Sequence, residues 1–101
     1  MASIERTLAG PTAGDYYSAA TYYYESGKDL EQAYTWIKQA NEMNAGAPKY
    51  WQLRRQALIE AKLGRKEEAV ASAKQSLELA REAGNMDYVR MNEADIEEWS
   101  M

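Results

Sequence analysis

Two arginines and two aromatic residues have the spacing best suited to binding chemistry in this 101-residue chain. Arg54 and Arg90 are 36 residues apart, and Tyr17 and Trp51 fall beside them when two similar segments of the sequence are aligned. A guanidinium group can bind a carboxylate through two parallel hydrogen bonds, and aromatic side chains anchor many protein interfaces. The four residues predict a site for a peptide or protein segment, an acidic one if both arginines bind carboxylates.

Residues for catalysis or for cofactor and metal binding are scarce. The chain has no histidine and no cysteine, which removes the commonest general base, the commonest metal ligand and every thiolate site. The glutamate pairs at 67–68 and 97–98 are adjacent on predicted helices, so their carboxylates diverge. The acidic run 93–98 lacks the glycine and alternating ligands of a calcium loop, and no glycine-rich phosphate-binding motif occurs. We therefore predict a protein that is not an enzyme, with no cofactor and no metal.

The elements that must position the binding residues repeat along the chain. The recurring residues are Gly27, Ala33, Ile37 and Ala40 in one copy and Gly64, Ala69, Ala73 and Ser76 in the other. Each copy has the pattern helix, glycine turn, helix, which is typical of helical repeat arrays. Such hairpins stack because one hairpin cannot bury its own apolar face, and the stack presents a concave surface. The prediction is an all-α domain over 1–101, with one repeat at 12–46, a second at 48–83 and a capping helix at 86–99.

Capping and turn residues predict where the helices begin and end. A short N-terminal helix is expected over 3–9. Thr12 with Asp15 and Asp29 with Gln32 form capping-box patterns. Helix ends are expected at Gly27, Gly64 and Gly84, and Pro48 suits the first turn of a helix.

Apolar residues at three-and-four spacing predict which helix faces are buried. The expected inward residues are Tyr16, Ala19, Ala20, Tyr23 and Tyr24; Leu30, Ala33, Tyr34, Ile37 and Ala40; Leu53, Ala57, Leu58 and Ala61; Ala69, Val70, Ala73, Leu77 and Ala80; and Val89, Ile96 and Trp99. Asn92 lies within the last of these stripes, so we expect it to be buried and bonded to a backbone carbonyl.

The first repeat resembles the tetratricopeptide pattern. Tyr16-x2-Ala19-Ala20-x2-Tyr23, Ala33-x3-Ile37 and Pro48 match W-x2-L-G-x2-Y, A-x3-F and P. In the second repeat, Gln56 and Glu60 stand where that pattern has Leu and Tyr. The resemblance implies tetratricopeptide-like hairpins whose first helices line the concave face.

A second resemblance covers most of the chain. The segments 4–17, 22–30, 84–92 and 96–99 are similar to a domain-of-unknown-function family found mainly in Bacteroidetes. In that family a β-rich N-terminal domain precedes a C-terminal helical region. The resemblance implies that this chain is the C-terminal region of an exported protein, and it supplies no catalytic residue.

Alignment of the repeats predicts rows of residues on the concave face. The rows are Tyr17, Arg54 and Arg90; Gly14, Trp51 and Asp87; Thr21, Leu58 and Ala94; and Tyr24, Ala61 and Glu97. In the alternative, both arginines pair with acidic neighbours on adjacent helices, and Tyr17 and Trp51 are half-buried between hairpins. The alternative function is a structural domain that uses exposed aromatics, such as Tyr22, Trp36 and Trp51, to pack against a β-rich domain or another copy.

Composition limits the partners further. Apolar residues make up 46% of the chain and the net charge is −4, so binding driven by a nucleic-acid backbone is not expected. No apolar run approaches the roughly 20 residues of a membrane span. Residues 48–76 carry seven Lys/Arg and three Asp/Glu, whereas 77–101 carry two and seven. We expect a protein or peptide partner, no nucleic acid or membrane, and a monomer or weak homo-oligomer.

Overall fold

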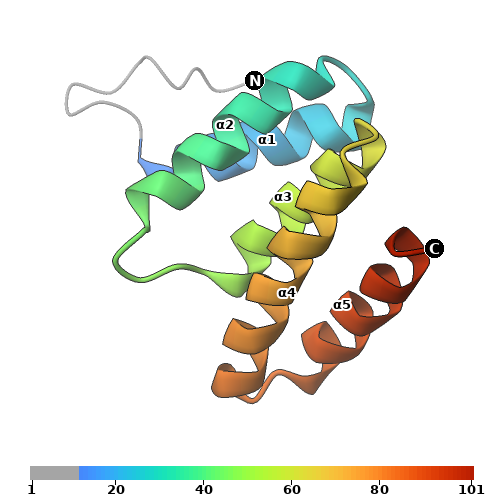
Figure 1. Ribbon diagram of the computed structural model, residues 1–101. Helices are drawn as coiled ribbons and strands as arrows, with labels where there is room; N and C mark the ends of the chain where they lie inside the picture. Colours follow the sequence, from blue (N-terminus) through green and yellow to red (C-terminus); the bar gives the residue numbers. More distant parts are fainter. Residues whose placement is uncertain (1–11) are drawn as a thin grey trace.

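The computed structural model describes residues 12–101, so the helix expected over 3–9 lies outside the described residues. The described part contains five helices and no strand: α1 (Ala13–Ser26), α2 (Leu30–Met43), α3 (Tyr50–Lys62), α4 (Lys66–Ala83) and α5 (Met86–Trp99) (Figure 1). The prediction of an all-α fold is confirmed for this part of the chain.

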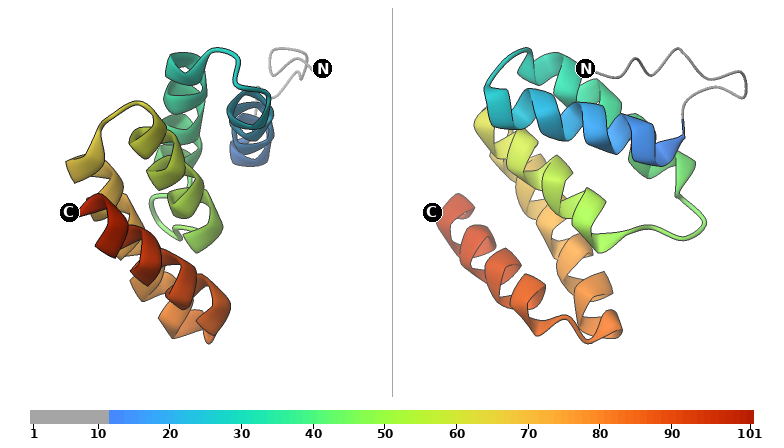
Figure 2. Two further views of the ribbon diagram at one scale, coloured as in Figure 1. Left: turned by 90° about the vertical axis from the view of Figure 1, so that its right-hand side faces the viewer. Right: turned by 180° about the vertical axis from the view of Figure 1, so that it is seen from behind.

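The helices form two hairpins and a terminal helix. α1 packs on α2, α3 packs on α4, α2 joins the two hairpins through α3, and α5 lies along α4. Figure 1 looks onto α2 and α4, and the right-hand view of Figure 2 looks from behind onto α1 and α3. The molecule measures 42 × 28 × 18 Å, an elongated shape that follows from stacking hairpins side by side.

Local residues fix most helix ends as predicted. Thr12 and Asp15 form a capping box, with Thr12 Oγ1 accepting from the Asp15 amide at 3.1 Å and Asp15 Oδ2 accepting from the Thr12 amide at 2.9 Å. Asp29 accepts from the Gln32 amide, which is half of the expected box. The φ angles of Gly27, Gly64 and Gly84 are 66°, 83° and 79°, a conformation that glycine adopts without strain.

The prediction for Pro48 is wrong by two residues. α3 begins at Tyr50, and Lys49 in the N-cap position has an extended backbone with ψ 127°. Because the chain is still extended at Lys49, Pro48 lies in the connecting loop and not in the first helical turn.

The core follows most of the predicted stripes in α2 and α4, where only Leu30 and Val70 are half-buried, and departs further from them in α1, α3 and α5, where Ile96 and Trp99 are half-buried. Most of the expected alanines, with Tyr34, Ile37, Leu53, Leu77 and Val89, are buried. In α1 and α3, the residues that are expected to face inward but are only half-buried are Tyr16, Tyr23, Tyr24, Leu58 and Ala61, whereas Ile59 and Glu60 are enclosed. α3 packs against both α2 and α4, so its buried side is turned and is broader than a single stripe predicts.

Small residues set the spacing between helices. Ala20, Ala33, Ala57 and Ala69 are each 0% exposed. Alanine at such positions lets helix axes approach at the short end of the roughly 8–10 Å range.

Candidate interaction surface

The four predicted binding residues do not form a single cluster. Trp51 is 38% exposed at the start of α3, with its ring 5.0 Å from that of Tyr50. Tyr17 is half-buried against the core of the first hairpin. Arg90 is exposed and pairs with Asp87 on its own helix. The predicted row of Tyr17, Arg54 and Arg90 therefore does not present two arginines that are free to bind a ligand carboxylate together.

Arg54 is a link between helices. Its Nη1 donates to Asn92 Oδ1 at 2.9 Å and lies 2.8 Å from a carboxylate oxygen of Asp95, both on α5. Asn92 is fully buried, as predicted, but its amide donates to the Ser76 hydroxyl at 2.9 Å and not to a backbone carbonyl. The Ser76 hydroxyl itself donates to the Tyr50 carbonyl oxygen at 2.8 Å, which leaves its oxygen to accept from Asn92. The second possibility drawn from the sequence, pairing with an acidic neighbour on another helix, is what Arg54 does.

The neighbouring arginine, Arg55, has a different environment. Its guanidinium lies 5.0 Å from the ring centre of Tyr24 on α1, and Lys62 Nζ lies 5.5 Å from the same ring. Four of the five arginines in residues 12–101 pair with carboxylates, and Arg55 does not. Its buried Nε makes no hydrogen bond within that range, and neither does the buried hydroxyl of Thr21.

Residues of α1 and α3 on the same side as Arg55 define a candidate surface, which the contacts of Arg55 and Lys62 with Tyr24 join. We call it the α1–α3 face, and it consists of Tyr17, Thr21 and Tyr24 on α1 and Trp51, Arg55, Leu58 and Lys62 on α3. The α3 residues recur at intervals of three and four, so they share one side of the helix. That side alternates apolar groups (Trp51, Leu58) with cations (Arg55, Lys62), a composition suited to a segment carrying both apolar and acidic groups.

The repeat alignment pointed to Arg54 and not to Arg55, and it could not tell which of the two pairs with a carboxylate. Adjacent helix residues point about 100° apart, and only the position of α5 decides which guanidinium finds a carboxylate. The sequence feature that points to Arg55 is the three-and-four spacing of Trp51, Arg55, Leu58 and Lys62. This spacing places the four residues on one face of α3, and it can be seen without aligning the repeats.

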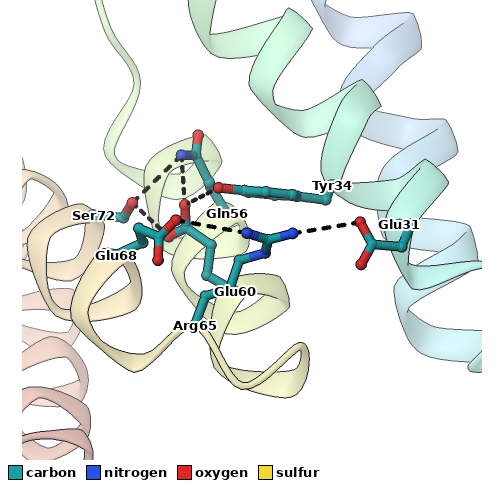
Figure 3. A network of polar contacts seen from close by, with 7 residues as sticks. All are labelled: Glu31, Tyr34, Gln56, Glu60, Arg65, Glu68 and Ser72. Atoms are coloured by element: carbon teal, nitrogen blue, oxygen red, sulfur yellow. Dashed lines mark hydrogen bonds and ion pairs between the residues drawn. The ribbon is translucent and has the colours of Figure 1, made fainter.

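Glu60 lies at the junction of the two hairpins (Figure 3). It is 2% exposed, and its carboxylate accepts hydrogen bonds from the Tyr34 hydroxyl at 2.9 Å, the Gln56 amide at 3.0 Å and the Ser72 hydroxyl at 2.7 Å. Tyr34 comes from α2, Gln56 from α3 and Ser72 from α4. The carboxylate thus joins three helices, and its enclosure makes it a structural link, not a group that a substrate can reach.

Burial raises the pKa of Tyr34 to about 12, reinforced by the hydrogen bond to Glu60 and by the negative charges of Glu60 and Glu68, and opposed by Arg65. The ring of Tyr34 is also flanked by cations, with Lys38 Nζ 4.5 Å and the Arg65 guanidinium 5.2 Å from its centre. Arg65 in turn lies 3.7 Å from Glu31 and 3.8 Å from Glu68 (Figure 3).

A hollow of about 760 Å³ is lined mostly by α2 and α4, the two helices that lie in front of α1 and α3 in Figure 1. Its walls are the second helices of the two hairpins, with Lys38 and Glu42 on α2 and Lys74 and Glu78 on α4, and Leu53 of α3 also lines it. The repeat alignment expected a groove lined by the first helices, so this hollow is not the predicted one.

Two further observations concern the described residues only. Within 12–101 no group of three or more acidic side chains is placed to hold a metal ion. No helix in this range is both long enough and apolar enough to cross a bilayer.

Comparison of the chain with protein-family models, with curated proteins and with solved structures finds no match. The tetratricopeptide-like repeat type and the Bacteroidetes relationship therefore stay predictions from the sequence.

Proposed function

We propose that this chain is a non-catalytic protein-interaction module that binds an acidic peptide or protein segment on the α1–α3 face. The observation that carries the proposal is Arg55, a cation stacked on Tyr24 with no carboxylate partner in the described residues. We also propose, from the sequence resemblances alone, that the hairpins are tetratricopeptide-like and form the C-terminal region of a longer exported protein.

The chemistry of the face supports this kind of ligand. A guanidinium held against an aromatic ring is already oriented, so less conformational freedom is lost when it binds a carboxylate. Lys62, 5.5 Å from the same ring, adds positive charge beside Arg55. Trp51 supplies an exposed aromatic surface for apolar contact about one helical turn away.

Selection from a random peptide library with free C-termini tests the proposal. We expect enrichment of acidic peptides, and Arg55→Gln should weaken their binding about 10- to 100-fold, the equivalent of one charge-assisted interaction. Arg90→Gln is the matched control, since Arg90 is an exposed arginine that already pairs with Asp87, and it should change binding less than about threefold. Unselective enrichment, or acidic enrichment that Arg55→Gln does not alter, would refute the proposal.

A second candidate function is a structural domain that packs against a β-rich domain or another copy of itself. The exposed aromatics Trp51 and Tyr22, 38% and 44% accessible, favour it. In that case the library yields no selective peptide, and Trp51→Ala lowers self-association measured by sedimentation equilibrium. An unchanged monomer–dimer equilibrium in that variant would argue against self-association through Trp51.

A further inference from the structure

The internal repeat relates two pairs of neighbouring helices, α2 with α3 and α4 with α5, whose shared surfaces we call the first and second shoulder. A further helix packs on the first shoulder at α3, and none packs on the second within the described residues. At a spacing of 36 residues, Lys38, Asn41 and Glu42 on α2 correspond to Lys74, Leu77 and Glu78 on α4. On the following helices, Ala57, Glu60 and Ala61 on α3 correspond to Glu93, Ile96 and Glu97 on α5. The pair α4–α5 thus repeats the pair α2–α3, one unit further along the chain.

In the first shoulder the α3 side is covered, whereas Lys38 and Glu42 on the α2 side stay exposed and line the hollow of about 760 Å³ described above. The covering helix is α4. Ala57 is 0% and Glu60 2% exposed beneath it, and the Ser72 hydroxyl of α4 satisfies a Glu60 oxygen at 2.7 Å. The buried residues of α4 are small apart from Leu77: they are Ala69, Ser72, Ala73, Ser76, Leu77 and Ala80. The first shoulder therefore binds a helix that has mostly small residues in contact with it and a polar side chain, Ser72, that hydrogen-bonds to the Glu60 carboxylate.

The shoulder of α4 and α5 contains a hollow of about 600 Å³. The residues that line it are Lys74, Leu77, Glu78, Glu93, Ile96 and Glu97. Leu77 and Ile96 form an apolar floor. Of the three carboxylates around it, that of Glu78 already pairs with Arg81 at 3.0 Å, which leaves Glu93 and Glu97 against the ammonium group of Lys74. The position that holds the buried Ala57 in the first shoulder holds the exposed Glu93 in the second.

From this correspondence and this charge balance, we infer that the α4–α5 shoulder binds a basic amphipathic helix of a partner protein. Apolar side chains of that helix pack on Leu77 and Ile96, and its lysines or arginines face Glu93 and Glu97. A neutral helix like α4 fits less well, because Glu93 would lose water without gaining a cation. The inference is independent of the α1–α3 face, which has the opposite charge.

A peptide derived from α4 provides the probe. It has the sequence of Lys66–Ala83 with the four glutamates replaced by lysine, so it keeps the small-residue face and becomes strongly basic. Binding is measured by titration calorimetry on the whole chain, and the location is read from isoleucine methyl resonances in NMR spectra. We expect the Ile96 methyl signal to shift, whereas Ile37 and Ile59, both 0% exposed, stay in place and serve as internal references.

Charge-reversal variants separate this site from general attraction to an acidic protein. Glu93→Lys/Glu97→Lys should weaken the peptide at least about tenfold, because two attractive contacts become repulsive. Glu25→Lys/Glu67→Lys changes the net charge equally at exposed positions on α1 and the start of α4, and it should alter the affinity less than about threefold.

Three results would overturn the inference. A scrambled peptide of the same composition that binds equally well would show a charge effect without a helix site. An unmoved Ile96 signal in the unsubstituted chain, which depends on no variant folding, would place the peptide elsewhere. A shift of Ile96 with protein concentration alone would assign the shoulder to a second copy of this chain.

Discussion

Replacing Glu60 by glutamine should destabilise the fold, even though the two side chains have nearly the same size. The carboxylate accepts three hydrogen bonds, from the Tyr34 hydroxyl, the Gln56 amide and the Ser72 hydroxyl. Glutamine turns one acceptor oxygen into an NH2 donor. In the place of Oε2 this group faces the Gln56 amide, another donor; in the place of Oε1 the Ser72 hydroxyl can turn to accept from it, but the hydroxyl proton then loses its acceptor. The remaining hydrogen bonds become neutral and therefore weaker.

The expected size of the loss comes from two opposing contributions. One buried polar group left without its partner costs about 1–3 kcal/mol. Removal of a buried charge relieves some desolvation, which reduces the loss without cancelling it. We expect a net decrease of about 1–3 kcal/mol in the free energy of unfolding, and each kcal/mol lowers Tm by about 4–8 °C in a domain of this size.

Urea unfolding followed by tryptophan fluorescence at neutral pH measures this difference. Glu68→Gln is the matched control, because Glu68 is an exposed glutamate on α4 whose contact with Arg65 is long, at 3.8 Å. It should change stability by less than about 0.5 kcal/mol. If Glu60→Gln is as stable as the unsubstituted chain, the three hydrogen bonds contribute nothing net and the explanation of the hairpin junction is wrong.

Three other predictions follow from the same structure. Because the folded-state pKa of Tyr34 is raised to about 12, the contribution of this pKa shift to stability is complete below pH 10 and is lost between pH 10 and 12, at about 1.4 kcal/mol per pH unit. The free energy of unfolding, measured in urea, should therefore decrease less between pH 8 and pH 11 in Tyr34→Phe than in the unsubstituted chain. An equal decrease in the two proteins would contradict the raised pKa of Tyr34. Ala69→Leu should destabilise by about 1–3 kcal/mol through overpacking, and the exposed Ala71→Leu should not; equal thermal stability of both variants would refute the close-packing argument. Arg54→Met leaves Asn92 and Asp95 without their partner and should lower stability by about 1–3 kcal/mol, with faster amide hydrogen exchange in α5, whereas exchange in Arg90→Met should match that of the unsubstituted chain.

Features determined by neighbouring residues could be predicted from the sequence. The capping box of Thr12 and Asp15 and the left-handed glycines at 27, 64 and 84 depend only on local backbone geometry, and all are present. The buried stripes of α2 and α4 follow from helical spacing alone.

Features that depend on three helices at once could not be predicted. The burial of Ile59 and Glu60 requires α3 to be covered by both α2 and α4, whereas a periodic pattern specifies a single face. The choice between Arg54 and Arg55 depends on where α5 brings Asp95, which is 41 positions after Arg54. The sequence therefore could not tell that Arg54 pairs with residues of α5 and that Arg55 has no carboxylate partner in the described residues.

The polar contacts across the hairpin junctions bear on how the molecule unfolds. In arrays whose units touch only through apolar faces, each unit can open with partial independence of its neighbours. Here Glu60 bonds to residues 26 positions before and 12 after it, and Arg54 bonds to Asn92, 38 positions later. If either hairpin opened alone, the Glu60 carboxylate or the Asn92 amide would lose a hydrogen-bond partner while it is still largely buried. The two hairpins and the terminal helix should therefore melt as one cooperative unit, with a calorimetric enthalpy equal to the van't Hoff enthalpy.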